Sequence, residues 1–393
     1  MGRTVRAGQR PRDRRLDRPG LPAAQTPGAQ RGAVPWRRAV VPDLCGVLRA
    51  VPVGQRRCRS AAGRGCAGDG LVQRMRHRAA RIEDGKIVEI HIQRDAHWVL
   101  GECGMGRVDR RTPAGAYIIT EDGSEVLLRS KMGAAEGTYV AFEVTREAIA
   151  EPGRIKPPEV ILRGSVPEDT LSKDGLWEQR LAAFGGSTAT QAFDDGFDTA
   201  IAGYAQVGDV IISFQRTKAG LVFDVDGIGD AFAINRIAAL EIARLLRLYQ
   251  VGAMVMIDFV SMEAKAQRAE IANIFDAASA QDSRPFERTA INGYGLMQVV
   301  RARPRPSVLD HLFGTRIAAL SDETQAYWLL RSAARSSGFG DRTITARPAV
   351  AHLLLSERWQ SLRAECARLA GAGVAVVADE NATGYGHVHV AQS

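Results

Sequence analysis

The chain has 393 residues, of which 45% are hydrophobic and 24% charged, and a formal net charge of +8. This length allows two or more domains. No apolar run reaches the ~18 residues of a membrane span, so we expect no membrane segment. No signal-peptide pattern opens the chain. Its five cysteines form no Cys-x-x-Cys pair, which predicts neither a disulfide framework nor a zinc link and favours a reducing cytoplasm.

The basic excess lies entirely in the first 80 residues. They hold 18 Arg and 4 Asp but no Lys or Glu, which leaves 34 basic and 40 acidic groups for the remaining 313 residues. The segment shows no hydrophobic period of about 2 or 3.6 residues. We interpret residues 1–78 as an Arg-rich extension that is either disordered or translated outside the natural reading frame. A basic tail that binds nucleic acid is the alternative.

Alternating apolar residues begin near residue 79 and predict β-structure. Residues 81–95 and 115–130 are each typical of two strands joined by an Asp-Gly turn. A further alternating strand follows at 137–149. We therefore predict a small antiparallel β domain over 79–164, for which a five-stranded barrel of the oligonucleotide-binding type fits.

The rest of the chain follows a different pattern. Residues 165–205 are polar and glycine-rich and predict a linker. Residues 206–313 predict an α/β core, with an amphipathic helix over 235–252 and a buried strand over 253–260. Residues 314–393 are predicted to form a C-terminal α/β extension. The expected fold class is thus α+β or α/β, with a small antiparallel β domain followed by a mixed α/β core.

Three carboxylates follow apolar runs in this core. Asp224 and Asp226 share one face at the C-terminal end of a predicted strand, and Asp258 lies near the end of the next one. A right-handed strand–helix–strand unit brings these ends together at the edge where α/β sheets bind ligands. Three carboxylates there suit Mg²⁺ or Mn²⁺, which can polarise a phosphate and activate water. Alternatively, the carboxylates cap strand ends or pair with arginines.

The segment 205–313 closely resembles the catalytic core of the ribonuclease E/G family, and 80–164 resembles its opening strands more weakly. The similarity rests on the strand that ends at Asp224, the helix Asn235–Leu248 with its Asn-x-x-Ala-Ala-x-Glu-Ile-Ala-Arg pattern, and Ile-Asp258-Phe. It implies an endoribonuclease in which Asp224 and Asp258 match the two magnesium-binding aspartates. Asp226 stands where the family usually has Asn.

The resemblance also implies contacts with RNA. Arg301 and Arg303 match basic residues that would hold the RNA backbone. Lys265 and Arg268 follow on the predicted helix after the third carboxylate and could contact phosphates, although exposed basic residues on a helix are usually solvated.

Two parts of the family pattern differ. The Cys-Pro-x-Cys zinc link is not found after the core. Larger members carry a pocket that reads an RNA 5′ monophosphate with an Arg-Thr signature. Residues 164–203 contain no Arg-Thr pair, and the nearest pairs on either side, Arg111-Thr112 and Arg216-Thr217, fall in predicted strands, so we expect no separate sensing domain.

We therefore interpret the chain as a cytoplasmic, metal-dependent endoribonuclease that hydrolyses phosphodiester bonds of single-stranded RNA. The alternative is an RNA-binding protein with weak or no nuclease activity, because the chain beyond the extension is net acidic and holds phosphate poorly by charge alone. A metal-dependent phosphatase or deoxyribonuclease would use the same kind of site. The sequence leaves the RNA target, the cut-site preference and the oligomeric state open.

Overall fold

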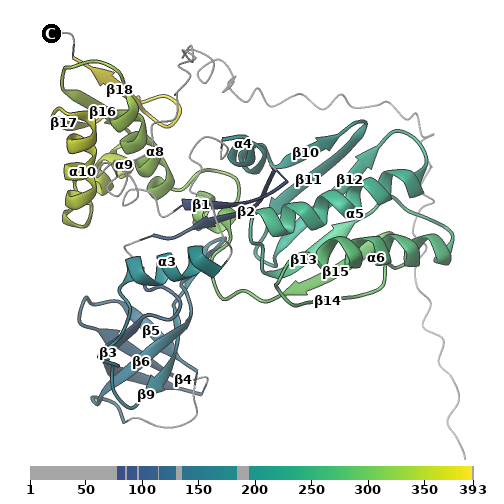
Figure 1. Ribbon diagram of the computed structural model, residues 1–393, viewed down its shortest axis with the longest axis horizontal. Coiled ribbons are helices and arrows are strands. Elements are labelled where there is room, and N and C mark those ends of the chain that lie inside the picture. The colour runs from purple at the N-terminus through teal and green to yellow at the C-terminus, as the bar shows by residue number, and fades with distance from the viewer. Residues whose placement is uncertain are drawn as a thin grey trace, which may run out of the picture. The chain divides into compact units, whose positions relative to one another are not determined.

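The computed structural model describes residues 78–84, 86–94, 97–113, 115–129, 135–183 and 194–391, shown in Figure 1. The predicted extension over 1–78 lies outside these residues except for its last. None of the described helices is long and apolar enough to cross a membrane.

The strands are β1 (Arg78–Glu83), β2 (Lys86–Ile92), β3 (Cys103–Thr112), β4 (Gly115–Thr120), β5 (Glu125–Leu128), β6 (Tyr139–Arg146), β7 (Ile149–Glu151), β8 (Arg154–Lys156), β9 (Glu159–Arg163), β10 (Tyr204–Val207), β11 (Val210–Arg216), β12 (Leu221–Gly227), β13 (Ala253–Asp258), β14 (Phe286–Arg288), β15 (Leu296–Arg301), β16 (Arg342–Ala346), β17 (Val374–Ala378) and β18 (His387–Val390). The helices are α3 (Lys173–Ala183), α4 (Asp194–Ala202), α5 (Ala231–Leu248), α6 (Lys265–Ser279), α7 (Val308–Phe313), α8 (Asp322–Arg335), α9 (Pro348–Leu355), α10 (Gln360–Ala370) and the 3₁₀ helix η2 (Glu357–Trp359).

A closed five-stranded barrel forms in the order β3-β4-β5-β9-β6 (Figure 1). Its interior is filled by inward-facing apolar side chains such as Val108, Ile118 and Phe142, which are fully buried. The predicted small β domain is present, with two differences. The β5–β9 pair is parallel. The strand pair β1–β2 forms a sheet of its own instead of joining the barrel.

The β1–β2 hairpin packs against the α/β core. Ile90 and Ile92 of β2 belong to the same buried cluster as α5. Arg247 of α5 also donates hydrogen bonds to Glu83 and Glu89 of the hairpin. These contacts join residues about 160 positions apart in the sequence. The local alternation of apolar residues correctly predicts the two strands, but it does not show that α5 packs against them.

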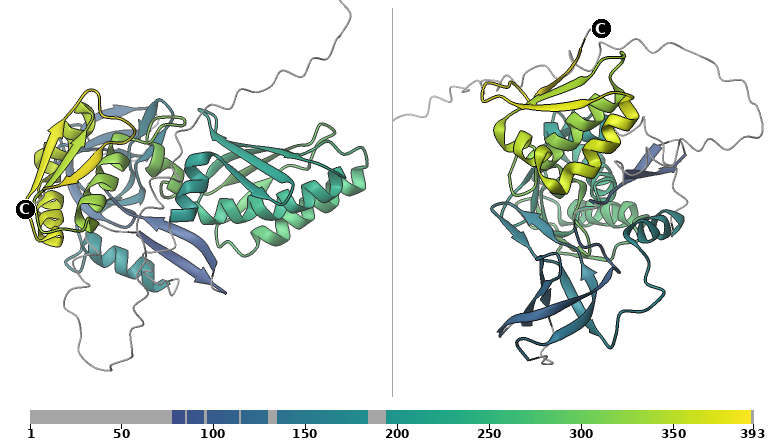
Figure 2. Two further views of the ribbon diagram at one scale, coloured as in Figure 1. Left: turned by 90° about the horizontal axis from the view of Figure 1, so that it is seen from above. Right: turned by 90° about the vertical axis from the view of Figure 1, so that its left-hand side faces the viewer.

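The central sheet has six strands in the order β10-β11-β12-β13-β15-β14. Strands β12 and β13 are parallel and joined by α5, which confirms the predicted strand–helix–strand unit. Helices α5 and α6 lie on one face of the sheet (Figure 2). Helix α5 begins at Ala231, four residues before the predicted start, because the side chain of Asp230 accepts a hydrogen bond from the backbone nitrogen of Ala233 and caps the helix.

Residues after α7 form a unit with its own core. Helices α8, α9 and α10 pack with the sheet β17-β16-β18 around a buried cluster that includes Leu330, Ile344, Trp359 and Cys366. Helix α9, the 3₁₀ helix η2 and helix α10 follow one another along residues 348–370 of this predicted C-terminal extension.

Asp310 of α7 ties several segments together. It is 5% exposed and forms a capping box with Ser307, whose backbone nitrogen lies 2.7 Å from its carboxylate. Arg216 of β11 and Arg303 donate to the same carboxylate at 3.1 and 3.0 Å. Burial alone would raise the pKa of Asp310, but the charges of Arg303 and Arg216 lower it below its ordinary value. Arg216 also donates to the backbone oxygen of Ala150 at 2.7 Å, which links β7 to the central sheet.

Asp310→Asn should lower the free energy of unfolding by about 3 kcal/mol, because it leaves the largely buried guanidinium of Arg216 without its charge partner and leaves Arg303 paired with Glu151 alone. Urea unfolding measures this. The matched control is Asp322→Asn, which removes the exposed partner of Arg316 and should cost less than about 1 kcal/mol. Equal stability of Asp310→Asn and wild type would contradict the role given to this network.

Candidate functional site

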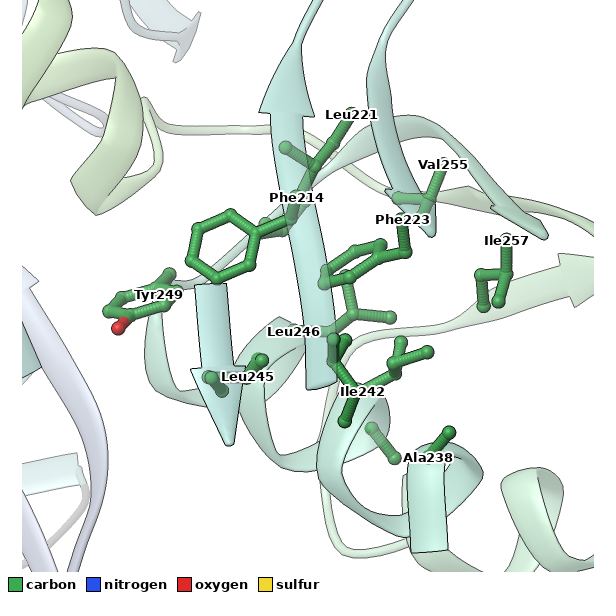
Figure 3. Packing of buried hydrophobic residues seen from close by; sticks show 14 of the residues in the cluster. Phe214, Leu221, Phe223, Ala238, Ile242, Leu245, Leu246, Tyr249, Val255 and Ile257 are labelled. Atoms are coloured by element: carbon green, nitrogen blue, oxygen red, sulfur yellow. The ribbon is translucent and has the colours of Figure 1, made fainter. Parts of the chain in front are cut away.

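Asp224 and Asp258 lie side by side at the ends of two parallel strands. They are Cα partners across β12 and β13. The preceding residues, Phe223 and Ile257, are buried and point toward Ile242 and neighbouring side chains of α5 (Figure 3). Because side chains alternate along a strand, this packing turns both carboxylates to the opposite face of the sheet, where both are exposed.

The two carboxylates have no counter-charge in the described part of the chain. Neither Asp224 nor Asp258 forms an ion pair or a side-chain hydrogen bond with a described residue, so the alternative that they cap strand ends or pair with arginines finds no support there. Partial burial raises the pKa of Asp258, and the negative charge of Asp224 raises it further. The site therefore holds two repelling carboxylates that a cation would stabilise.

Asp226 lies on the same exposed face of the sheet as Asp224, but it is not paired with a carboxylate on a neighbouring strand. It lies two residues beyond Asp224, opposite Ile211 of β11, and its side chain is exposed. Among the described residues, no group of three or more His, Cys, Asp or Glu side chains is arranged to hold a metal ion. The structure thus brings two of the three predicted carboxylates together, and a role of Asp226 as a ligand stays a prediction.

Asn235 fixes the chain just beyond Asp258. This residue of α5 is completely buried. Its side-chain nitrogen donates to the backbone oxygen of Val260 at 2.7 Å, and its side-chain oxygen accepts from the backbone nitrogen of Val260 at 3.0 Å. In the sequence, Asn235 stands out only as the first residue of the motif that resembles the family. Its position on the apolar face of an amphipathic helix was a sign of a structural role, because a buried side-chain amide needs hydrogen-bond partners.

A tight turn supports the other side of the site. Leu296 of β15 is the Cα partner of Asp258, and Gly295 accepts from the backbone nitrogen of Phe259 at 3.1 Å. Gly295 has φ of +92°, and a Cβ atom there would lie 2.2 Å from the backbone oxygen of Phe259. The turn therefore requires glycine. It presents the ring of Tyr294, which is 81% exposed, at the carboxylate edge of the sheet.

The segment that carries this geometry has recognisable relatives. Residues 212–304 match the Ribonuclease E/G family. The predicted resemblance is thereby confirmed, and the matched segment contains both paired aspartates and Asn235.

Individual ribonucleases show the same similarity. The chain is 36% identical over 98 residues to Ribonuclease E of Escherichia coli strain K12, covering 25% of this chain and 9% of that protein. It is 30% identical over 144 residues to Ribonuclease G of the same strain, covering 33% and 29%. It is 28% identical over 112 residues to the chloroplastic Ribonuclease E/G-like protein of Arabidopsis thaliana, covering 26% and 11%. The matches thus span less than a third of each relative.

The arginines expected to hold RNA lie away from the aspartates. Arg301 is at the opposite end of β15, level with Ala253, whereas Asp258 is level with Leu296. Five residues along a strand correspond to about 17 Å. Arg301 is 6% exposed and pairs with Asp282. Its predicted role in holding the RNA backbone remains untested and requires that ion pair to open.

The other three basic residues differ in their surroundings. Arg303 pairs with Glu151 at 2.9 Å and with Asp310, so it too is engaged within the protein. Arg268 donates to the backbone oxygen of Met262 at 2.6 Å at the start of α6. Lys265, the first residue of α6, is exposed. Contacts of these residues with phosphate stay predictions.

Asn235→Ala should lower the free energy of unfolding by about 2 kcal/mol, because it leaves two backbone groups of Val260 without hydrogen-bond partners. Chemical denaturation provides the measurement. Asn381→Ala, an exposed position in a turn, is the control and should change stability little. If the two variants are equally stable, the hydrogen bonds of Asn235 do not hold the strand end.

Proposed function

We propose that the protein is an endoribonuclease that hydrolyses phosphodiester bonds of single-stranded RNA with a divalent cation held by Asp224 and Asp258. The observation that carries the proposal is the pairing of these carboxylates, without a described counter-charge, inside the segment that matches the Ribonuclease E/G family. The relatives are named as ribonucleases, which supports RNA as the substrate.

The residues present fit Mg²⁺ or Mn²⁺. Mg²⁺ sites that act on phosphates use one or two carboxylates and keep several waters, so a third acidic ligand is not needed. A bound ion of this kind polarises a phosphoryl oxygen and lowers the pKa of a bound water. Asp224 and Asp258 would hold it, and Asp226, on the same face, would orient water. Asn235 would act as a positioning residue, since it fixes the chain two residues after Asp258.

Exposed apolar side chains near the aspartates suit a single-stranded substrate. Tyr294 is 81% exposed on the glycine turn beside Asp258, and Ile228, just after β12, is 88% exposed. Unpaired bases stack on aromatic rings such as that of Tyr294, and each stacked base contributes about 1–3 kcal/mol to binding. The barrel offers a second surface, where exposed Tyr139 is the Cα partner of Arg107.

Asp224→Asn and Asp258→Asn should each abolish Mg²⁺-dependent cleavage of a labelled single-stranded RNA. Both variants should be at least as stable as wild type in metal-free buffer, because each removes one of two repelling charges. Asp226→Asn should be milder, since Asn is the residue that the family usually carries there. Asp209→Asn, an exposed position in the β10–β11 turn, is the matched control.

Cleavage by Asp258→Asn at near wild-type rates would refute the metal role of this residue. RNA binding without cleavage by any form of the protein would favour the alternative, an RNA-binding protein with weak or no nuclease activity. Cleavage of DNA or of phosphomonoesters in preference to RNA would change the substrate class.

Cleavage rates should not depend on the RNA 5′ end. The Arg216-Thr217 pair is closed to a ligand, because Arg216 is 6% exposed and donates to Asp310 and to three backbone oxygens. We expect equal rates for 5′-monophosphorylated, 5′-hydroxyl and circular forms of one RNA. A preference of about tenfold for the monophosphate, or ~1.4 kcal/mol, would indicate a sensing site elsewhere.

A further inference from the structure

The face of the central sheet that carries Asp224 and Asp258 is accessible beyond these two residues. Helices α5 and α6 lie on the opposite face (Figure 2). Val222 and Met256, each two residues before an aspartate, lie on the accessible face because side chains alternate along a strand. Both are half-buried, and Val300 of β15 is 56% exposed. The surface beside the aspartates is therefore open and partly apolar.

A row of four side chains crosses this face next to the aspartates. Val222 and Met256 are Cα partners in its middle. Gln215 of β11 ends the row on one side, and Gln298 of β15 ends it on the other. We call these four residues the amide row. Two residues along a strand correspond to about 7 Å, so the row runs about 7 Å from the pair of aspartates.

The two amides of the row are available to a ligand. Gln215 and Gln298 are both exposed, and neither side chain forms a hydrogen bond with a described residue. Gln206 and Gln250, in contrast, use their side-chain nitrogens to donate to backbone oxygens of the protein. Each amide of the row offers hydrogen-bond donors and an acceptor.

The composition of the amide row suits a flat, uncharged group with a polar edge. None of its four side chains is charged, so the row does not hold a phosphate by charge. A nucleobase has apolar faces and a rim of donors and acceptors. Its face fits against Val222 and Met256, whose strands lie about 4.8 Å apart, and the thioether of methionine makes favourable contacts with aromatic rings. Its rim then lies within reach of the long glutamine side chains.

The neighbouring aspartates decide which occupant this face accepts. A protein or lipid surface laid over the row would also desolvate Asp224 and Asp258, and burial of unpaired charges is costly. A strand of RNA brings a phosphate and a divalent cation to the aspartates under the proposed function, which offsets their charge. A base of the same strand then lies beside the phosphate, at the row.

We propose that the amide row binds the base of a nucleotide next to the scissile phosphate and that Gln298 reads the edge of this base. The position of the phosphate rests on the proposed function, which holds it at Asp224 and Asp258. Bases of single-stranded RNA are recognised by stacking and by hydrogen bonds to their edges, and a glutamine amide distinguishes bases by the order of their donors and acceptors. Gln298 is thus a specificity-determining residue.

The first measurement is cleavage of a randomised single-stranded RNA pool by the full chain with Mg²⁺, followed by sequencing of the cut ends. Wild type should prefer certain bases at one position that flanks the cut. Gln298→Leu removes the amide and should reduce this preference about tenfold, or ~1.4 kcal/mol. Gln267→Leu, an exposed position on α6, is the matched control and should keep the wild-type preference.

A base-specific effect separates recognition from a structural role. Because Gln298 is exposed, Gln298→Leu should melt at the wild-type temperature. A structural role would lower the melting temperature and reduce cleavage at all sequences equally. The same base preference in wild type and Gln298→Leu would overturn the proposal.

The second measurement does not require cleavage. Methionine methyl groups are labelled with ¹³C in Asp258→Asn, which keeps RNA intact, and oligoadenylate is added. The methyl resonance of Met256 should shift when a base covers it, whereas that of Met297, which is completely buried, should stay in place. Met256→Leu assigns the resonance. A Met256 resonance that does not move at millimolar oligoadenylate would overturn the proposal.

The failure of the amide row is distinguishable from the failure of the nuclease. A shift of the Met256 resonance by RNA, in a protein whose wild-type form cleaves nothing, would contradict the proposed activity and leave the base site in place. Cleavage by wild type with a base preference that Gln298→Leu does not change would leave the nuclease in place and remove the base site.

Discussion

The candidate site depends on the parallel pairing of β12 with β13 under α5. Phe223 and Ile257 are buried against the helix, and this alone decides that Asp224 and Asp258 face the other way, next to one another. A slip of one residue in either strand would exchange its buried and exposed side chains. The apolar packing therefore holds the carboxylates of Asp224 and Asp258 next to each other, although their like charges repel.

The free energy of apolar burial exceeds the repulsion between the two aspartates, which explains why this pairing is stable. Each fully buried large apolar side chain contributes about 1.5–3 kcal/mol to folding. Two unit charges about 4 Å apart in water repel by about 1 kcal/mol. Packing of Phe223, Ile257 and their partners therefore outweighs the repulsion between the aspartates. The hydrogen bonds of Asn235 and the glycine turn at Gly295 then fix the chain on both sides of Asp258.

The sequence predicts the parts of this site that depend on local pattern. Alternation places Asp224 opposite Phe223, and a strand–helix–strand unit requires parallel strands, so the pairing with Asp258 follows. Contacts between distant segments could not be predicted. Alternation along β1 and β2 does not show that Arg247 binds the hairpin, and the sequence around Arg301 does not show that Asp282 occupies its guanidinium. A cation–π contact between Arg94 and Tyr327 likewise joins segments 233 residues apart.

The most direct test of the proposal that Asp224 and Asp258 share a divalent cation is a Mn²⁺ titration of the protein without RNA. Electron paramagnetic resonance detects the bound Mn²⁺. Our account predicts that wild type binds one ion per chain at this site, that Mg²⁺ competes for it, and that Asp224→Asn and Asp258→Asn each lose it while remaining folded. Mn²⁺ binding that persists unchanged in Asp258→Asn, or that is not detected in wild type at millimolar concentrations, would contradict the account.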